Sequence, residues 1–315
     1  MNPILYLVIP VYNEEKVLPK TAPIFLRKIE LLIENKKIHQ NSRILFIDDG
    51  SRDNTWNIIQ KLALDNELFK GISLSRNCGH QNALLAGLEE AKQFADITVS
   101  MDCDGQDDIN AVDEMVTAYL NGADVVYGVR KERKGDTFFK KTSAHFFYKF
   151  LNLMGAEVVY NHADYRLLSK RVLDAFSDFK EVNIYLRGIV PLVGFNSTIV
   201  YYERGKRIDG KSHYPLRKML SLAFNGITSL SIKPIRLITG FGIFVSFISF
   251  LLMLWSIISY FVSDTVSGWA STVAIISFLG GIQLVSIGVL GEYIGKIYLE
   301  VKRRPRYIIE NKTYE

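Results

Sequence analysis

The amino-acid sequence predicts an α/β fold in which a mostly parallel, Rossmann-like sheet is followed by membrane-embedded helices. From residue 4 to residue 130, short apolar runs alternate with segments of helical length, and several of these runs end in polar, acidic loops. Between Leu237 and Gly291, by contrast, the sole formally charged residue is Asp264. A chain of 315 residues is long enough for one or two domains, and this change in composition marks the boundary between them.

Strands buried on both faces are predicted where apolar residues run almost continuously. These runs are Ile4–Ile9, Arg43–Ile47, Gly71–Leu74, Ile97–Met101, Ala123–Tyr127 and Thr198–Glu203. The intervening helices are predicted at Lys16–Leu32, Asn54–Leu64, in a segment ending at Ala91, and at Ile109–Asn121. Ligands of parallel sheets lie beyond the carboxyl ends of the strands, where this chain carries the polar loops 12–15, 48–53 and 102–107.

The most informative of these loops begins with Asp102, Cys103, Asp104 and Gly105, directly after an apolar run. Side chains two apart in an extended chain point to the same side, so Asp102 and Asp104 would present two carboxylates together. A hard, oxygen-binding cation such as Mg²⁺ or Mn²⁺ would relieve their repulsion and keep positions open for phosphate oxygens. The alternative is an ordinary polar turn, because Asp and Gly are common there.

Composition excludes several other classes of site. The loop after the first predicted strand contains no glycine, and neither a dinucleotide-binding fingerprint nor a P-loop occurs. The net charge of +5 is modest, and much of the excess base flanks the apolar region, which indicates lipid head groups and no nucleic-acid partner. Cys78 and Cys103 have no metal-type spacing and are compatible with a reduced, cytosolic compartment.

Arginine residues after two of the runs are candidates for holding a phosphate, because the planar guanidinium forms bidentate hydrogen bonds. Arg130 follows the fifth run, and Arg166 follows Asp164 in the stretch ADYRLL. Asp164 could act as a general base or could orient Arg166. The alternatives are a solvated basic loop at Arg130 and a structural pair of Asp164 with Arg166.

Two membrane spans are predicted, Ile238–Val262 and Ser271–Leu290, since each is long enough to cross the hydrocarbon core. Their connecting loop contains no Lys or Arg, whereas both outer flanks are basic. The positive-inside rule then makes the two helices a hairpin with both flanks in the cytosol. Residues 138–154 interleave aromatic residues with lysines, which predicts an interfacial helix, with an amphipathic core helix as the alternative.

Five motifs in order carry a family resemblance over nearly the whole chain: VIPVYNEE, FIDDGSRDNT, LSRNCGHQNALLAG, MDCDGQDD and ADYRLLSKRV. With the C-terminal apolar pair, they resemble the polyprenyl-phosphate glycosyltransferases of family 2, which have the GT-A fold. The resemblance implies inverting transfer of a sugar from a nucleotide sugar to a lipid phosphate, with Mg²⁺ or Mn²⁺. A processive polysaccharide synthase of the same family is disfavoured, because the chain lacks QxxRW and has too few spans.

The resemblance also implies roles for individual residues. Pro10, Tyr12 and Glu14 would border the nucleotide base, with Asp49 near the base or ribose. Asp102 and Asp104 would hold the metal and the diphosphate, with Gln106 beside them as a third metal ligand, and Asp164, Asp104 and Gln106 would form the catalytic group. The acceptor phosphate would be bound by Arg130, Arg166, Ser169, Arg204 and Ser212. His213 stands where relatives often carry Lys after that serine, so the family's lysine contact is not expected.

The predicted organisation is a cytosolic GT-A domain (1–205), an active-site loop with a juxtamembrane helix (206–236), two transmembrane helices (237–292) and a cytosolic basic tail (293–315). The predicted function is transfer of glucose from UDP-glucose to undecaprenyl phosphate in the cytoplasmic membrane, for cell-envelope glycosylation. UDP-N-acetylglucosamine or another donor is the first alternative, and a non-catalytic membrane scaffold is the second. A downstream flippase and transferase and a homo-oligomer are the further partners expected.

Overall fold

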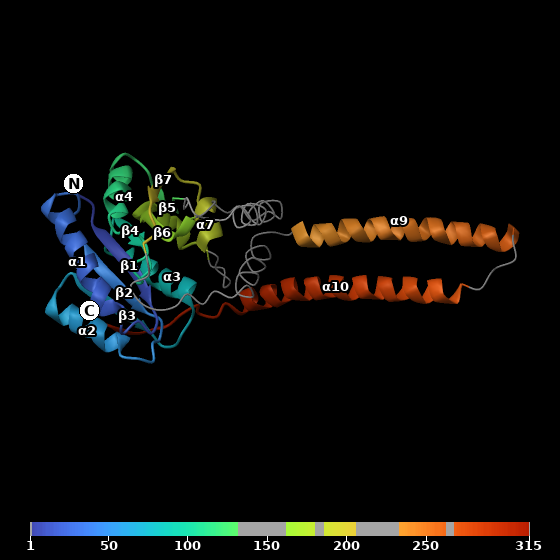
Figure 1. Ribbon diagram of the computed structural model, residues 1–315, viewed down its shortest axis with the longest axis horizontal. Coiled ribbons are helices and arrows are strands. Elements are labelled where there is room, and N and C mark those ends of the chain that lie inside the picture. Colours follow the sequence, from blue (N-terminus) through green and yellow to red (C-terminus); the bar gives the residue numbers. More distant parts are fainter. Residues whose placement is uncertain (1, 132–161, 180–185, 206–232, 263–267, 315) are drawn as a thin grey trace. The chain divides into compact units, whose positions relative to one another are not determined.

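The computed structural model describes residues 2–131, 162–179, 186–205, 233–262 and 268–314. The chain divides into two compact units. The first contains the described residues up to 205 together with those from 304 onward, and the second contains two long helices (Figure 1). The predicted interfacial helix at 138–154 and most of the predicted 206–236 segment, including Ser212, lie outside the described residues.

The first unit is built on one eight-stranded sheet with the order β7-β5-β6-β4-β1-β2-β3-β8. Six of its strands correspond to the predicted runs, whereas β6 and β8 come from segments where no strand is predicted. The strands are β1 (Leu5–Val11), β2 (Arg43–Asp48), β3 (Phe69–Leu74), β4 (Ile97–Ser100), β5 (Val125–Arg130), β6 (His162–Ser169), β7 (Ser197–Tyr202) and β8 (Ile309–Lys312).

Strand direction determines which loops meet. The pairs β1–β2, β1–β4, β2–β3 and β5–β7 are parallel, while β6 runs antiparallel to both β4 and β5, and β8 runs antiparallel to β3. The carboxyl ends of β1, β2, β3, β4, β5 and β7 therefore share one edge with the amino end of β6. The predicted functional loops follow these carboxyl ends, so one edge of the sheet gathers them.

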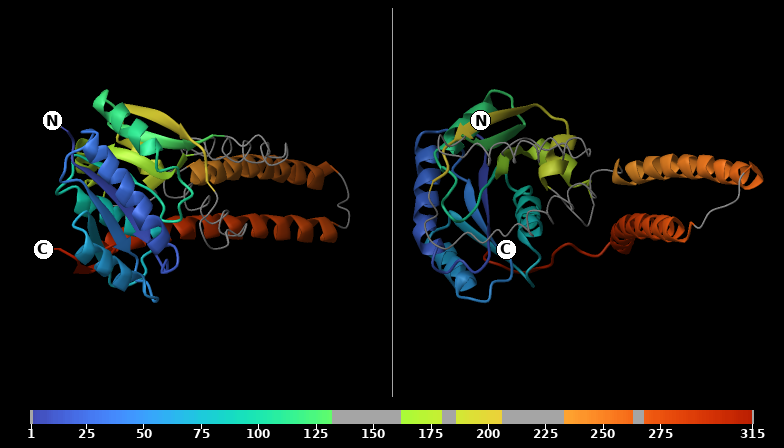
Figure 2. Two further views of the ribbon diagram at one scale, coloured as in Figure 1. Left: turned by 60° about the vertical axis from the view of Figure 1, so that its left-hand side comes forward. Right: turned by 45° about the vertical axis from the view of Figure 1, so that its right-hand side comes forward.

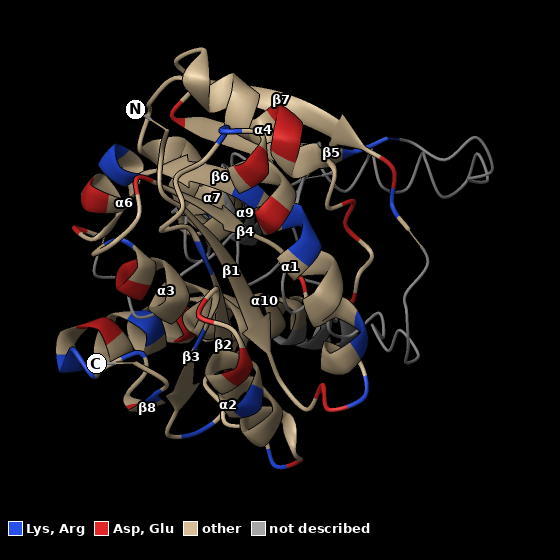
Figure 3. Cartoon of the chain, turned by 90° about the vertical axis from the view of Figure 1, so that its left-hand side faces the viewer, with Lys and Arg blue, Asp and Glu red and all other residues tan. Residues whose placement is uncertain are grey.

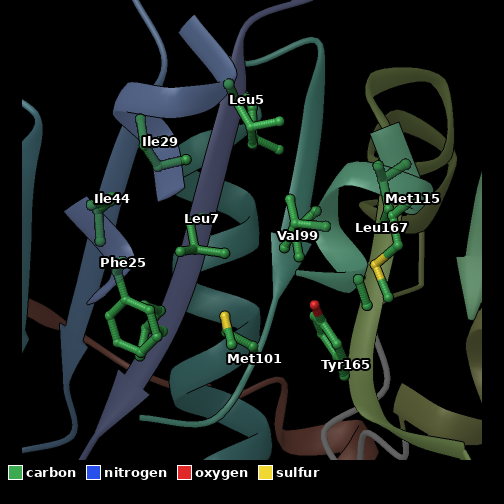
Figure 4. Packing of buried hydrophobic residues seen from close by; sticks show 14 of the residues in the cluster. Leu5, Leu7, Phe25, Ile29, Ile44, Val99, Met101, Met115, Tyr165 and Leu167 are labelled. Carbon is green, nitrogen blue, oxygen red and sulfur yellow. The ribbon is translucent and has the colours of Figure 1, made fainter. Parts of the chain in front are cut away.

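Helices cover both faces of the sheet (Figure 2). The side chains of β1 alternate between two apolar cores, with Leu7 in one and Val8 in the other, because successive side chains of a strand point to opposite faces. Helices α1 (Leu18–Glu34), α2 (Thr55–Asp65) and α4 (Ala111–Leu120) pack on the first face, part of which Figure 4 shows. Helices α3 (His80–Ala91), α6 (Lys170–Phe176) and α7 (Leu186–Leu192) pack on the second.

The central strands β1 and β4 contain no charged residue (Figure 3). Water is excluded from both faces there, so ionised side chains would lose their hydration. The charged residues that follow these strands lie in the loops beyond their carboxyl ends, which leaves the polar chemistry at the edge of the sheet.

The second unit contains α9 (Lys233–Val262) and α10 (Trp269–Lys302), which include the two predicted spans. Among the described residues, one stretch, Phe278–Lys302 of α10, is long and apolar enough to cross a membrane, and α9 provides the shorter apolar stretch Ile235–Val245. The predicted two-helix transmembrane hairpin is therefore not confirmed. The predicted tail is not a separate element, since α10 extends to Lys302 and β8 then joins the sheet of the first unit.

Candidate functional site

Hydrogen bonds join the loop after β1 to the loop after β2. The backbone N–H of Asn13 donates to Ser51 Oγ (2.9 Å), and Asn13 Oδ1 accepts from the N–H of Arg52 (2.9 Å). The N–H of Glu14 donates to Thr55 Oγ1 (2.9 Å). Asn13 has a φ of 54°, a left-handed conformation that asparagine tolerates better than most residues. The two joined loops form one wall of the site, and this wall contains the residues predicted to border the nucleotide base.

The predicted base-bordering residues differ in their exposure. Pro10 lies within β1 opposite Ile47 and is buried, so its role is to shape the strand end. Tyr12 is 42% exposed, and Glu14 is partly buried beside it in the same loop. Part of the Tyr12 side chain is therefore accessible to solvent.

Asp49 connects β2 to the loop after β3. Its carboxylate accepts hydrogen bonds from the N–H of Cys78 (2.7 Å) and of Gly79 (3.0 Å). Burial raises the pKa of Asp49, and these two hydrogen bonds oppose that rise. Gly50, with a φ of 65°, permits the close approach, because a Cβ there would lie 2.6 Å from the backbone of Arg76. Asp49 is 3% exposed and thus supports the wall of the site, in addition to the nucleotide contact predicted for it.

Asp102 and Asp104 lie in the loop that follows β4. The Asp102 side chain is 42% exposed, whereas Asp104 is 7% exposed and accepts the N–H of Gln106 at Oδ1 (3.0 Å). Enclosure by the protein raises the pKa of Asp102 to about 6; His80 opposes this rise, while the carboxylates of Asp107, Asp164 and Asp104 add to it. Such a concentration of negative charge favours a cation at this position.

A preassembled protein cage for a metal is absent from the residues that the structure describes: they contain no group of three or more His, Cys, Asp or Glu side chains arranged to hold an ion. Mg²⁺ is usually held by one or two carboxylates together with water and substrate phosphates. Asp102 and Asp104 supply that number of carboxylates, so the pair fits such an ion.

Asp164, at the amino end of β6, lies beside this pair. Its Oδ1 accepts from Arg166 Nη2 (2.6 Å), and its Oδ2 accepts from Gln81 Nε2 (3.3 Å). His80 Nε2 is 3.6 Å from Asp164 Oδ2 and 3.8 Å from Asp102 Oδ1. Sequence reasoning did not select His80 and Gln81, although they stand in the quoted motif LSRNCGHQNALLAG. Their position as the first two residues of α3 brings them to the site.

Arg166 is wrongly predicted to bind the acceptor phosphate directly. It is 2% exposed, and Nη1 also donates to the carbonyl of Leu186 (3.3 Å), so its guanidinium is enclosed and holds Asp164 in place. Ser169 is wrongly placed as well. It pairs with Ile97 at the opposite end of β4, and its hydroxyl caps α6 and donates to Asp124 Oδ1 (2.9 Å). The antiparallel course of β6 carries Ser169 away from Asp164.

Two other predicted acceptor contacts have partners on the loop after β4. Arg130 donates through Nε to the hydroxyl of Tyr202 (3.0 Å) and through Nη2 to Asp107 Oδ1 (3.5 Å), and its side chain is 26% exposed. Arg204 Nη2 donates to Gln106 Oε1, the oxygen that a metal-binding role for Gln106 would require. Gln106 thus orients Asp104 through its N–H while Arg204 occupies its side-chain oxygen.

Comparisons with known proteins give the family. Residues 6–176 match the family described as glycosyl transferase family 2. The chain is 47% identical over 313 residues to the uncharacterized glycosyltransferase YkoT of Bacillus subtilis (99% of this chain, 93% of that protein). It is 40% identical to the bactoprenol glucosyl transferase of Shigella phage SfV (97% and 98%) and 38% identical to a prophage homologue from Escherichia coli (96% and 97%).

Among solved structures, glucosyl-3-phosphoglycerate synthase from Mycobacterium tuberculosis aligns with a TM-score of 0.45 and 18% identity, over 72% of this chain and 78% of that one. The family assignment rests on the sequence matches, which extend over nearly the full chain. The predicted family resemblance and the predicted enzyme class are confirmed: the chain belongs to glycosyl transferase family 2 and is a glycosyltransferase with the GT-A fold.

Proposed function

We propose that this protein transfers a sugar, with glucose from UDP-glucose as the favoured donor, to a polyprenyl phosphate in the cytoplasmic membrane. The supporting observation is the extent of the match to the bactoprenol glucosyl transferase of phage SfV, which spans 97% of this chain and 98% of that one. Such a match includes the apolar helices as well as the catalytic unit, so it supports a lipid acceptor. The product would be a lipid-linked sugar for cell-envelope glycosylation, consumed by a flippase and a second transferase.

The donor would bind along the carboxyl edge of the sheet, with its base against the wall formed by Tyr12, Glu14 and Asp49. Asp102 and Asp104 would hold Mg²⁺ or Mn²⁺ together with the donor diphosphate. The bound ion would act as a Lewis acid toward the diphosphate. The carboxylates of Asp107, Asp164 and Asp104 around Asp102 support this role, because a cation would offset their mutual repulsion.

The acceptor needs positioning more than deprotonation. The second pKa of a phosphate monoester is about 6, so the lipid phosphate already carries most of its charge near neutral pH. Arg130, with a partly exposed side chain, is the described arginine that best fits contact with this phosphate. Asp164, fixed by Arg166, would orient His80 and the acceptor and is not required as a strong base.

Membrane insertion as a two-helix hairpin is supported by the pairing of β8 with β3. Both strands belong to the first unit, and the chain between them contains α9 and α10. A single crossing between these strands would leave them on opposite sides of the bilayer, so an inserted chain must cross an even number of times. Large apolar side chains of these helices are exposed: Leu237, Ile243, Phe244, Phe247, Trp255, Ile276, Phe278, Leu284, Val285 and Ile294.

The test is a donor panel with purified full-length protein and undecaprenyl phosphate. UDP-glucose, UDP-N-acetylglucosamine and GDP-mannose, each labelled in the sugar, are incubated with Mg²⁺ or Mn²⁺, and label is measured in the lipid fraction. We expect transfer from UDP-glucose, loss of transfer in Asp104→Asn, and a product carrying a single sugar. If only another donor supports transfer, its sugar would replace glucose as the proposed substrate. If no donor labels the lipid fraction, the proposal of a lipid acceptor is refuted.

A further inference from the structure

The loop that carries Asp104 is held from the side by the end of β7. Gln106 is the point of attachment, because its N–H, its carbonyl and its side-chain oxygen all have partners. Its N–H donates to Asp104 Oδ1 (3.0 Å), its carbonyl accepts from the N–H of Gly205 (2.8 Å), and its side-chain oxygen accepts from Arg204 Nη2. A Cβ on Gly205 would lie 3.5 Å from the carbonyl oxygens of Gly105 and Gln106, so the two segments lie in close contact.

A second attachment lies one residue further along the same loop. The Tyr202 hydroxyl donates to Asp107 Oδ1 (2.6 Å), to which Arg130 Nη2 also donates at 3.5 Å. The Asp107 side chain is 1% exposed, and its Oδ2 has no hydrogen-bond partner within the described part of the chain. Burying a carboxylate is costly unless hydrogen bonds compensate, so the short bond from Tyr202 is the main support of Asp107.

Tyr202 is itself held rigidly. It is 2% exposed, and its ring packs edge-on against Tyr165, with the ring centroids 5.1 Å apart. The Tyr165 hydroxyl in turn donates to the carbonyl of Asp108 (2.9 Å). Residues 106–108 of the loop are thus hydrogen-bonded by residues of β5, β6 and β7 and by Arg204 and Gly205, which follow β7.

We propose that Tyr202 and Arg204 are positioning residues that fix the loop Gly105–Asp108, so that Asp104 is oriented for a divalent cation. This inference rests on the proposed metal site at Asp102 and Asp104. Residues that hold a metal ligand in place commonly change metal affinity by about 10- to 100-fold when they are removed.

Two neighbouring tyrosines give a matched pair of variants for the test. Tyr202→Phe removes the hydroxyl that supports Asp107, while Tyr201→Phe removes the same group from a side chain that is 57% exposed. Binding of Mn²⁺ alone to the full-length protein is followed by electron paramagnetic resonance, and thermal unfolding is recorded for each variant. We expect Tyr202→Phe to weaken Mn²⁺ binding by about tenfold and Tyr201→Phe to leave it within about twofold of wild type.

Arg204 provides an independent second test, because it is exposed and its replacement does not open the core. Arg204→Met is expected to weaken Mn²⁺ binding by about tenfold, with Arg204→Lys restoring part of the loss since it keeps one donor. If Arg204→Met and a folded Tyr202→Phe both bind Mn²⁺ as tightly as Tyr201→Phe, the positioning role is refuted. Asp104→Asn separates the two proposals: unchanged Mn²⁺ binding in that variant would refute the metal site itself.

Discussion

Removing the guanidinium of Arg166 should destabilise the protein strongly. Arg166 is 2% exposed and lies 2.6 Å from Asp164, whose side chain is 9% exposed. In Arg166→Met, Asp164 would remain buried without its counter-charge, and breaking such a pair typically costs about 3–5 kcal/mol. For a domain of about 150–250 residues, 1 kcal/mol corresponds to roughly 2–4 °C in Tm, so the expected decrease in Tm is roughly 6–20 °C.

The assay is thermal unfolding of the full-length protein in detergent, with Arg171→Met as the matched control. Arg171 forms an ion pair with Asp124 at 3.6 Å, but its side chain is 69% exposed, so its removal should cost less than about 1 kcal/mol. Arg166→Lys should fall between wild type and Arg166→Met, because one ammonium group cannot reach both Asp164 and the carbonyl of Leu186 as the guanidinium does.

A double-mutant cycle identifies the cause. Replacing Asp164 with Asn in the Arg166→Met background removes the uncompensated charge, so the double variant should be more stable than the sum of the two single losses predicts. Unfolding of Arg166→Met within about 2 °C of wild type, together with a raised acceptor KM, would contradict the structural role of Arg166. Arg166 would then contact the lipid phosphate after all, as the sequence alone suggests.

Three further outcomes are expected. Asp104→Asn should abolish most transferase activity with little change in Tm, because it alters a proposed metal ligand at a strand end. A chelator should have the same effect on the wild type, and full activity in chelator would refute the metal assignment. In a Cys78→Ser background, cysteines placed at Ser267 and Glu310 should be labelled from opposite sides of the membrane, and labelling of both from one side would refute the hairpin. In the wild type at pH 8, a thiol reagent should modify Cys78 and spare Cys103, because Cys103 is buried and burial raises its pKa to about 12. Denaturation should make both cysteines reactive, and rapid modification of Cys103 in the native protein would contradict its burial.

The family, the positions of six strands and the acidic loop at the end of β4 can all be predicted from the sequence alone. Each of these features depends on a short, continuous segment of sequence: an apolar run of strand length, a pair of aspartates two residues apart, or a motif with fixed spacing. The apolar composition of residues 237–291 is equally local. Such features need no knowledge of distant contacts, because a continuous apolar run of strand length and the loss of charge from a segment are visible along the chain.

The positions of β6 and β8 in the sheet, and with them much of the site, depend on tertiary contacts. β6 contains Asp164 and Arg166 and does not read as a buried strand, yet it is inserted antiparallel between β4 and β5. That insertion brings Asp164 toward Asp102, carries Ser169 to the opposite edge and buries Arg166 as a structural partner. Strand order and direction arise from pairing between distant segments, whose energies depend on which strands meet and not on the pattern within each one. For the same reason, His80 reaches the two carboxylates through the packing of α3 against the sheet, a contact that no local periodicity encodes.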